Sequence, residues 1–439
     1  MPIKIIRNLQ DGKLEFSRGN GRRIPGTLPG SNQESNQLNS SKSEIEASVR
    51  RVLEDVRLNG DSAVRHYSSV FDGVKIENVA VDRKDVIQST TTINQDLLTA
   101  LKFSAARIRK YHEATKPPTW VEIEKGLSEK TVPLERVGIY VPGGTASYPS
   151  SVLMTAIPAR VAGVDEIIMC TPSASPEVLA AADIAGVDRI FRIGGSQAIA
   201  AMAYGTESIP KVDMVCGPGN IYVTLAKKLV FGEVAIDGLY GPTEMVLLAD
   251  ATADPSHCAA DILAQAEHDP LASPILVTDS DTLVQQVQDQ LYRQLERLDR
   301  KEVIEAALDH GGYIVKVKNI DEAVDLANFI APEHVCLLLK DPSAAAAKIR
   351  HAGGLFIGQY SPEVVGDYVA GPSHVMPTGG TARFFSALGV HQFLRTMPIV
   401  SLEGDGFDVM ADAVSLIARA EGLTAHAKAM EIRVKGREI

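Results

Sequence analysis

The chain has 439 residues, of which 45% are hydrophobic and 23% are charged, and its formal net charge at pH 7 is −11. This length exceeds what a single hydrophobic core usually holds, so we expect two or more domains. The acidic balance argues against a general nucleic-acid-binding protein, because such proteins present a basic surface. The sequence shows neither a long apolar run nor a signal-peptide hydrophobic stretch, so we expect no membrane association.

The cysteines are far apart in the sequence and form no CxxC pair; they are Cys170, Cys216, Cys258 and Cys336. This spacing excludes a zinc ribbon and argues against a disulfide scaffold. We therefore expect reduced, structural thiols in a cytoplasmic protein.

The N-terminal segment is predicted to be an arm that ends near residue 43. Its second part, 18–43, is rich in Gly, Ser, Asn, Gln and Pro, which is typical of a mobile or loosely docked segment. Helical patterns follow at 43–60 and 96–114.

The region 137–243 alternates short apolar runs with Ala-rich helical segments. Strands are predicted at 137–141, 166–170, 189–193 and 213–216, and helices at 149–161, 176–185, 196–203 and 220–230. This βαβα alternation predicts a parallel, doubly wound, incomplete Rossmann-like sheet.

A second α/β alternation covers 244–380. Strands are predicted at 244–248, 274–278, 313–317, 335–339 and 355–357. The helix predicted between the first two has Asp254 as its N-cap and Pro255 at its first position. After residue 380 the alternation stops, and the mostly helical tail, 381–439, is too small for a core of its own. We expect this tail to pack on a partner.

Three Gly-rich turns, each between a predicted strand and a predicted helix, indicate a nucleotide site. They lie at 142–144, 194–195 and 217–219. Helix N-termini offer free N–H groups to phosphates, and ligands of open α/β sheets bind at strand carboxyl ends. None is a GxGxxG sequence, and each alone is also explained as a tight turn. Gln197 and Asn220 follow two of the turns and would suit ribose hydroxyls or a nicotinamide amide.

Four pairs of polar residues are candidates for chemistry. They are Gln265 with His268, Glu333 with His334, Asp367 with His374, and Glu421 with His426. Nitrogen and oxygen donors of this kind suit one borderline metal ion, and an acid next to a base suits proton transfer. Taken singly, three of the pairs are better explained by a solvated helix end or an ordinary turn, whereas the Gly- and Pro-rich loop around Asp367 favours function.

Taken together and in order, these segments resemble the histidinol dehydrogenase family from about residue 44 to the C-terminus. The matching stretches are 137–144, 192–200, 217–224, 263–269, 331–334, 366–372 and 419–426.

The resemblance implies a functional role for each of the candidate residues. It implies zinc ligands at Gln265, His268, Asp367 and His426, the acid/base pair Glu333 and His334, and NAD contacts at Tyr140, Gln197 and Asn220. Substrate contacts would be Thr243, Gln265, His268, His334, Asp367, His374, Glu421 and His426.

The resemblance also implies domains and partners. The NAD domain would be 137–243, and the zinc and substrate domain would be 44–136 with 244–380. The family is a homodimer whose tail reaches the neighbouring subunit's site. The implied reaction is the zinc-dependent, NAD-linked, four-electron oxidation of L-histidinol to L-histidine through L-histidinal in histidine biosynthesis, with His334 as general base and Glu333 activating water.

Some residues depart from the family pattern near the substrate. Tyr240 stands where a small residue is expected, Thr243 where Ser is expected and Ser373 where Asn is usual. The alternative hypothesis is therefore a paralogue that oxidises another small polar alcohol, such as a hydroxysulfonate or an amino alcohol. From other classes, a zinc hydrolase would turn over without NAD, and a binding protein would show no turnover.

Overall fold

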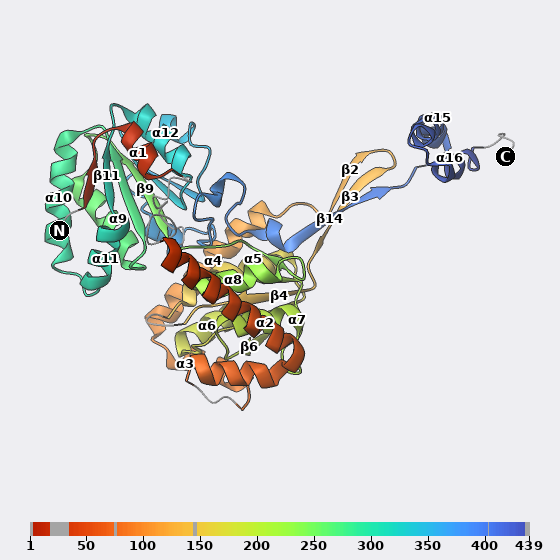
Figure 1. Cartoon of the computed structure of the whole chain (residues 1–439), viewed down its shortest axis with the longest axis horizontal. Helices are drawn as coiled ribbons and strands as arrows, with labels where there is room; N and C mark the ends of the chain where they lie inside the picture. Colours follow the sequence, from red (N-terminus) through yellow and green to blue (C-terminus); the bar gives the residue numbers. More distant parts are fainter. Residues whose placement is uncertain (1–2, 18–34, 74–76, 144–146, 403, 435–439) are drawn as a thin grey trace. The chain divides into compact units, whose positions relative to one another are not determined.

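The computed structural model describes residues 3–17, 35–73, 77–143, 147–402 and 404–434 (Figure 1). The chain divides into two compact units. The first contains Met1–Lys116 and Leu134–Phe393, and the second contains Pro117–Pro133 and Leu394–Ile439. Each unit is described here by itself.

The first sheet of unit 1 is five-stranded and parallel, with the order β6-β5-β4-β7-β8. Its strands are β4 (Arg136–Tyr140), β5 (Glu166–Cys170), β6 (Arg189–Phe191), β7 (Met214–Cys216) and β8 (Ala235–Ile236). The helices between them are α5 (Pro149–Ala162), α6 (Pro176–Ala185), α7 (Gly195–Tyr204) and α8 (Ile221–Val230). The chain winds outward from β4 to one side and then to the other, which confirms the predicted doubly wound sheet.

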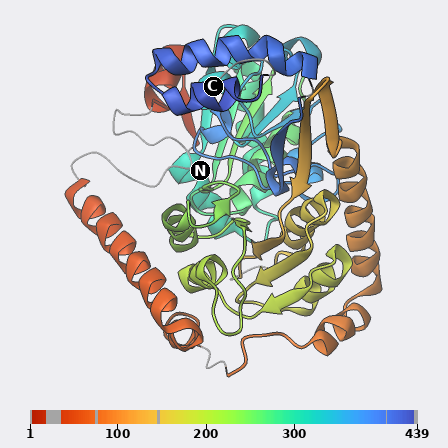
Figure 2. The ribbon, with the colours of Figure 1, turned by 90° about the vertical axis from the view of Figure 1, so that its right-hand side faces the viewer.

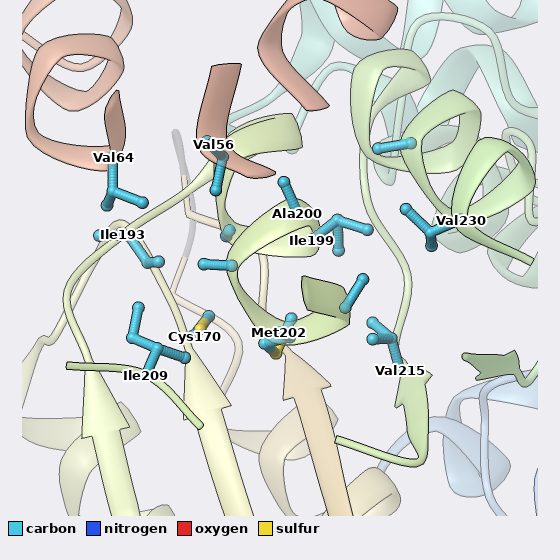
Figure 3. Packing of buried hydrophobic residues seen from close by; sticks show 14 of the residues in the cluster. Val56, Val64, Cys170, Ile193, Ile199, Ala200, Met202, Ile209, Val215 and Val230 are labelled. Carbon is cyan, nitrogen blue, oxygen red and sulfur yellow. The ribbon is translucent and has the colours of Figure 1, made fainter. Parts of the chain in front are cut away.

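One face of this sheet is covered by α7, α8 and the long helix α2 (Ser35–Phe71). Val56 and Val64 of α2 pack with Ile199 and Met202 of α7 in one buried cluster, as Figure 3 shows. Two further helices of this unit are α3 (Arg83–Thr92) and α4 (Gln95–Thr115).

The second sheet of unit 1 is six-stranded and parallel, with the order β1-β11-β10-β9-β12-β13. Its strands are β1 (Lys4–Ile6), β9 (Glu244–Ala249), β10 (Ser273–Thr278), β11 (Tyr313–Lys316), β12 (His334–Leu338) and β13 (Gly354–Ile357). From β9 onward the chain winds in the same order as in the first sheet.

Helices cover both faces of this second sheet (Figures 1 and 2). They are α1 (Leu9–Glu15), α9 (Pro255–Glu267), α10 (Asp281–Leu295), α11 (Lys301–Gly311), α12 (Ile320–Ile330) and α13 (Pro342–Ala346). Leu247 of β9 belongs to the cluster under α9, α10 and α11, and its neighbour Leu248 belongs to the cluster under α12. Successive side chains of a strand point to opposite faces, which explains the division.

The start of the predicted arm differs from the expectation, because it is part of this sheet. β1 pairs with β11, and Phe16, just after α1, is 2% exposed and packs its ring against Tyr313. At the other end of the predicted arm, helix α2 begins at Ser35, earlier than expected. Residues 18–34 lie outside the described residues.

The second unit contains an antiparallel sheet with the order β14-β3-β2 and two helices. Its elements are β2 (Trp120–Glu124), β3 (Leu127–Pro133), β14 (Leu394–Val400), α15 (Gly404–Ala420) and α16 (Thr424–Glu431). The helices confirm the predicted helical tail, whereas the three strands were not predicted. In the part of the chain that the structure describes, no helix combines the length and the apolar character that a membrane crossing requires.

Candidate active site

The predicted acid/base pair and Thr243 lie at the amino ends of two neighbouring strands of the second sheet. Glu333 directly precedes β12, which begins at His334, and Thr243 directly precedes β9. β9 and β12 pair in parallel, with His334 beside Met245. The strand pairing therefore brings residues that are 90 positions apart in the sequence into hydrogen-bond contact.

The backbone before Glu333 has an unusual conformation. Ala331 ends α12 with a φ of 55°, the one positive φ of a residue other than glycine in the described part of the chain. Such outliers cost free energy and are often found at functional sites. Here the left-handed turn ends the helix and, with Pro332, directs the chain into β12 at the acid/base pair.

The Glu333 carboxylate is buried and held at one oxygen. Thr243 Oγ1 donates to Glu333 Oε2 at 2.6 Å, and the Glu244 amide donates to the same oxygen at 3.2 Å. Burial raises the pKa of Glu333, while the His334 charge and the two hydrogen bonds act in the opposite direction. A raised carboxyl pKa suits a group that must both accept and release a proton.

His334 lies beside two carboxylates. Its Nδ1 is 3.7 Å from Glu363 Oε2 and 3.9 Å from Glu333 Oε2, and its ring makes an edge contact with Phe356. Among the described residues this buried nitrogen has no hydrogen-bond partner. The surrounding carboxylates would stabilise the imidazolium that forms when His334 accepts a proton.

Glu363 is a site residue that the sequence analysis missed. It opens α14 (Glu363–Tyr368), its side chain is fully buried, and it lies one turn before Asp367. Burial raises its pKa well above the usual value, and the Asp367, Asp261 and Glu333 charges raise it further. The spacing of four between Glu363 and Asp367 was the available signal, because it places both on one helix face.

The Gln265 amide joins Glu363 to the loop before β9. In the orientation that satisfies both of its ends, its nitrogen donates to both Glu363 oxygens at 2.7 and 2.9 Å. Its oxygen then lies 2.6 Å from Thr243 Oγ1 and accepts from the Glu244 amide at 3.1 Å. Gln265 is thus fixed on the buried side of the site.

His268 and Asp367 face each other, with His268 Nε2 3.7 Å from Asp367 Oδ2. The Asp367 carboxylate raises the pKa of His268. Burial alone would raise the pKa of Asp367, but His268, His334 and His374 together hold it below its usual value. Among the residues the structure describes, no cluster of three or more His, Cys, Asp and Glu side chains is arranged to hold a metal ion.

The His374 ring is held between the end of α14 and the start of α5. One ring nitrogen, Nδ1, is 2.9 Å from the Asp367 carbonyl, and Nε2 is 3.2 Å from Ser151 Oγ. The adjacent Ser373 hydroxyl donates to the Met154 carbonyl of α5. Burial lowers the pKa of His374, although Asp367 opposes this shift.

The candidate nucleotide residues lie at the carboxyl ends of the first sheet. Tyr140 ends β4, and its hydroxyl accepts from the Gly195 amide at 3.1 Å. Gln197 is fully buried in the first turns of α7, and its Oε1 has no partner among the described residues. Asn220 caps α8 by accepting from the amides of Tyr222 and Val223.

The turn between β7 and α8 is fixed by a buried ion pair. Lys227 Nζ donates to the Gly217 carbonyl and contacts Asp237, which accepts from the Gly217 amide at 2.7 Å. Gly217 has a φ of 111°, and a Cβ there would lie 2.1 Å from the Tyr140 carbonyl oxygen. The Tyr240 ring lies against Lys227, with the ammonium 4.7 Å from the ring centroid.

The last two predicted residues belong to the second unit. Glu421 lies directly after α15, and His426 lies in the first turn of α16. Both side chains are exposed. The other ten predicted site residues lie in the first unit, and five of them lie within the helices and strands described above. Glu333, Asn220 and Thr243 directly precede an element, His268 directly follows α9, and His374 lies in the loop after α14.

Comparisons with known proteins agree on one family. The histidinol dehydrogenase family model matches residues 35–434. The histidinol dehydrogenase of Aquifex aeolicus is 48% identical over 394 residues, which cover 89% of this chain and 92% of that protein. That of Bacillus subtilis is 46% identical, with 90% and 95% covered. The crystal structure of histidinol dehydrogenase from Elizabethkingia anophelis has a TM-score of 0.89 at 32% identity and covers 99% of this chain and 98% of that one.

Proposed function

Because the chain belongs to the histidinol dehydrogenase family, we propose that it oxidises L-histidinol to L-histidine through L-histidinal and reduces two molecules of NAD in each turnover. The family is one of oxidoreductases that act in histidine biosynthesis. The observation that carries the mechanism is the buried pair Glu333 and His334, in which one side chain suits proton removal from an alcohol and the other suits activation of water.

In the first oxidation, His334 accepts the hydroxyl proton of histidinol. The C–H bond of the same carbon breaks, and its electron pair leaves as hydride to the nicotinamide ring. The products are the aldehyde, NADH and a proton on His334. The nearby carboxylates of Glu333 and Glu363 stabilise the imidazolium formed in this step.

In the second oxidation, Glu333 accepts a proton from a water molecule as the water oxygen bonds to the aldehyde carbon. The carbonyl oxygen takes up the proton that His334 accepted in the first oxidation, which gives a hydrate and returns His334 to its neutral form. His334 then removes a hydroxyl proton from the hydrate, and the remaining C–H hydrogen leaves as hydride to a second NAD. The product is the carboxylic acid, and the two NADH account for the four electrons.

The residues Gln265, His268 and Asp367 of one chain would hold the zinc ion together with His426. Two imidazoles, a carboxylate and an amide oxygen are an acceptable donor set, and His268 and Asp367 already face each other. When bound, zinc would orient the amine and imidazole of the substrate and act mainly as a template rather than as a generator of hydroxide. His374 and Glu421 would complete the substrate site, with Glu421 facing the substrate ammonium.

NAD would bind at the carboxyl edge of the first sheet. The turn before α7 and the turn before α8 end in helix N-termini, which suit a pyrophosphate. Tyr140, Gln197 and Asn220 lie at these turns, and the unpartnered Gln197 oxygen suits a donor of the nucleotide.

The second unit would complete the site of a partner copy in a homodimer. Its helices expose large apolar side chains, among them Val409, Leu416 and Ile417 at 81%, 71% and 61%. Such a surface on a unit with few buried residues supports packing on another chain. The four buried free cysteines suit a reducing, cytoplasmic compartment.

The test is the amount of NADH formed per L-histidinol consumed, with zinc supplied and NAD in excess. Two NADH per histidinol support the proposed reaction. No NADH from a zinc-loaded protein that still binds NAD would contradict it and favour the paralogue, which Tyr240 and Thr243 motivate. NADH formation with other small alcohols would then identify the substrate.

A further inference from the structure

We propose that Thr243 is the positioning residue for Glu333 and that its hydroxyl turns the carboxylate toward the water that hydrates the aldehyde. This inference rests on the proposed function and assigns a role in one of its two steps. It differs from the substrate contact expected for Thr243, because the hydroxyl acts through Glu333.

The geometry places both described hydrogen bonds to Glu333 on the same oxygen. Oε2 accepts from Thr243 Oγ1 at 2.6 Å and from the Glu244 amide at 3.2 Å. An oxygen that already accepts two bonds is a poorer base toward a water molecule than its partner oxygen. Oε1 is therefore the oxygen that receives the water proton, and Thr243 determines its direction.

Thr243 has one hydroxyl proton and two acceptors at equal distance. Glu333 Oε2 and the Gln265 amide oxygen each lie 2.6 Å from Thr243 Oγ1. A carboxylate is the stronger acceptor, because charge-assisted hydrogen bonds are shorter and stronger than neutral ones. The proton therefore points to Glu333, and the Glu244 amide is shared between Glu333 Oε2 and the Gln265 oxygen.

The Thr243 side chain is suited to hold this direction. Its branched Cβ restricts rotation about χ1, so the hydroxyl has fewer orientations than a serine hydroxyl at the same place. Neighbouring contacts fix the backbone too: the Gly241 amide donates to Thr378 Oγ1, and the Ser273 amide donates to the Thr243 carbonyl. A fixed hydroxyl on a fixed loop orients a carboxylate more precisely than burial alone.

The test separates the two oxidations within one turnover. A zinc-loaded enzyme with excess NAD is mixed with less than one equivalent of L-histidinol, and the two phases of NADH formation are followed. The variants are Thr243→Val, which replaces the hydroxyl by a methyl group, Thr243→Ala and Thr243→Ser. Thr224→Val is the matched control, because it removes a partly buried threonine hydroxyl that donates to the Tyr240 carbonyl.

We expect Thr243→Val and Thr243→Ala to slow the second phase about tenfold more than the first, a part of the roughly 10²–10⁴-fold that general base catalysis contributes. Less than two NADH would then form per histidinol before the aldehyde is released. Thr224→Val should keep the wild-type ratio of the two rates. Thr243→Ser keeps the hydroxyl but rotates more freely about χ1, so its ratio should lie between those of the wild type and Thr243→Ala.

The positioning role would be overturned if Thr243→Val and Thr243→Ala slowed both phases equally. It would also be overturned if the ratio of the second rate to the first fell as far in Thr243→Ser as in those two variants. If Thr243→Val does not fold, the comparison of Thr243→Ala with Thr243→Ser decides. Failure of the proposed function is distinct, because the wild-type protein would then form no NADH from histidinol at all.

Discussion

The buried imidazole of His334 is the residue on which both proposed oxidations depend. We expect His334→Asn to lower kcat for histidinol by about 10²–10⁴-fold, because Asn cannot accept the proton. Asn is polar and smaller, so the fold and NAD binding should be kept. Steady-state kinetics, together with NAD titration and thermal unfolding of the variant, check this expectation. A variant with wild-type kcat would show that another group is the base.

His112 predicts a pH dependence of stability that is independent of the active site. It is buried in α4, its ring nitrogens have no partner among the described residues, and burial lowers its pKa to about 4. Below the ordinary pKa of 6.5 the unfolded chain binds a proton that the folded chain does not, so acidification destabilises the fold.

The difference is measurable with His112→Leu, which removes this titration. Between pH 7 and pH 5 the free energy of unfolding of the wild type should fall by about 2 kcal/mol more than that of the variant. Urea unfolding at the two pH values measures both. Parallel losses in the two proteins would mean that His112 is protonated in the folded state.

Most residues of the candidate site could be proposed from the sequence, because pairs such as Glu333 with His334 are adjacent and belong to motifs. Glu363 was missed although its spacing of four from Asp367 places both on one helix face, because such a spacing in a short helix fits an exposed face equally well. Its importance comes from burial beside His334 and Gln265, which are 29 and 98 positions away. Such contacts depend on the packing of α14 on the second sheet and cannot be derived from spacing.

At the scale of elements, the ion pair between Lys227 of α8 and Asp237 after β8 joins the ends of both elements to the turn at Gly217. We expect Lys227→Met to destabilise the protein by about 3–5 kcal/mol, because it leaves a buried carboxylate without a counter-charge. The double variant Lys227→Met, Asp237→Asn should lose less, since it buries no charge.

Urea unfolding of the wild type, the single variant and the double variant measures this difference, and NAD titration reports on the turn. The single variant should bind NAD more weakly than the double variant. If the double variant loses as much stability as the single variant, the charge of Lys227 does not offset the burial of the Asp237 charge. The loss would then come from packing alone.

The strands of unit 2 show where patterns along the chain are insufficient. In unit 1 the parallel strands are buried runs between helices, and the βαβ alternation located nearly all of them. β2 instead is exposed along its whole length, and β14 contains Pro398 at the edge of its sheet. Proline is tolerated on an edge strand but weakens a strand prediction. β14 also pairs with β3, from which it is separated by about 260 residues of sequence, and no local pattern indicates such a pairing.

At the scale of the whole molecule, the two sheets of unit 1 present opposite edges to their candidate ligands. The candidate nucleotide turns follow the carboxyl ends of β4, β6 and β7, whereas Thr243 and the candidate acid/base pair lie at the amino ends of β9 and β12. Only residues 237–243 connect β8 with β9, so the carboxyl edge of the first sheet leads directly to the amino edge of the second. This connection places Thr243 and Tyr240 between the proposed nucleotide and substrate sites.

A last prediction concerns the source of His426. If the second unit completes the site of a partner copy, two inactive variants should complement each other. His334→Asn damages the first unit, and His426→Asn damages the second. In a mixed dimer, one site combines both damaged units, and the other combines two intact units and is active. Random mixing should therefore restore about a quarter of the wild-type activity.

The variants are unfolded together, refolded as a mixture and assayed with histidinol, and each variant refolded alone is the control. If the mixture is active and neither control is, each active site combines the first unit of one chain with the second unit of the other chain. A mixture as inactive as the controls, at a size that confirms dimers, would place Glu421 and His426 in the site of their own chain. The exposed apolar face of α15 would then require another partner.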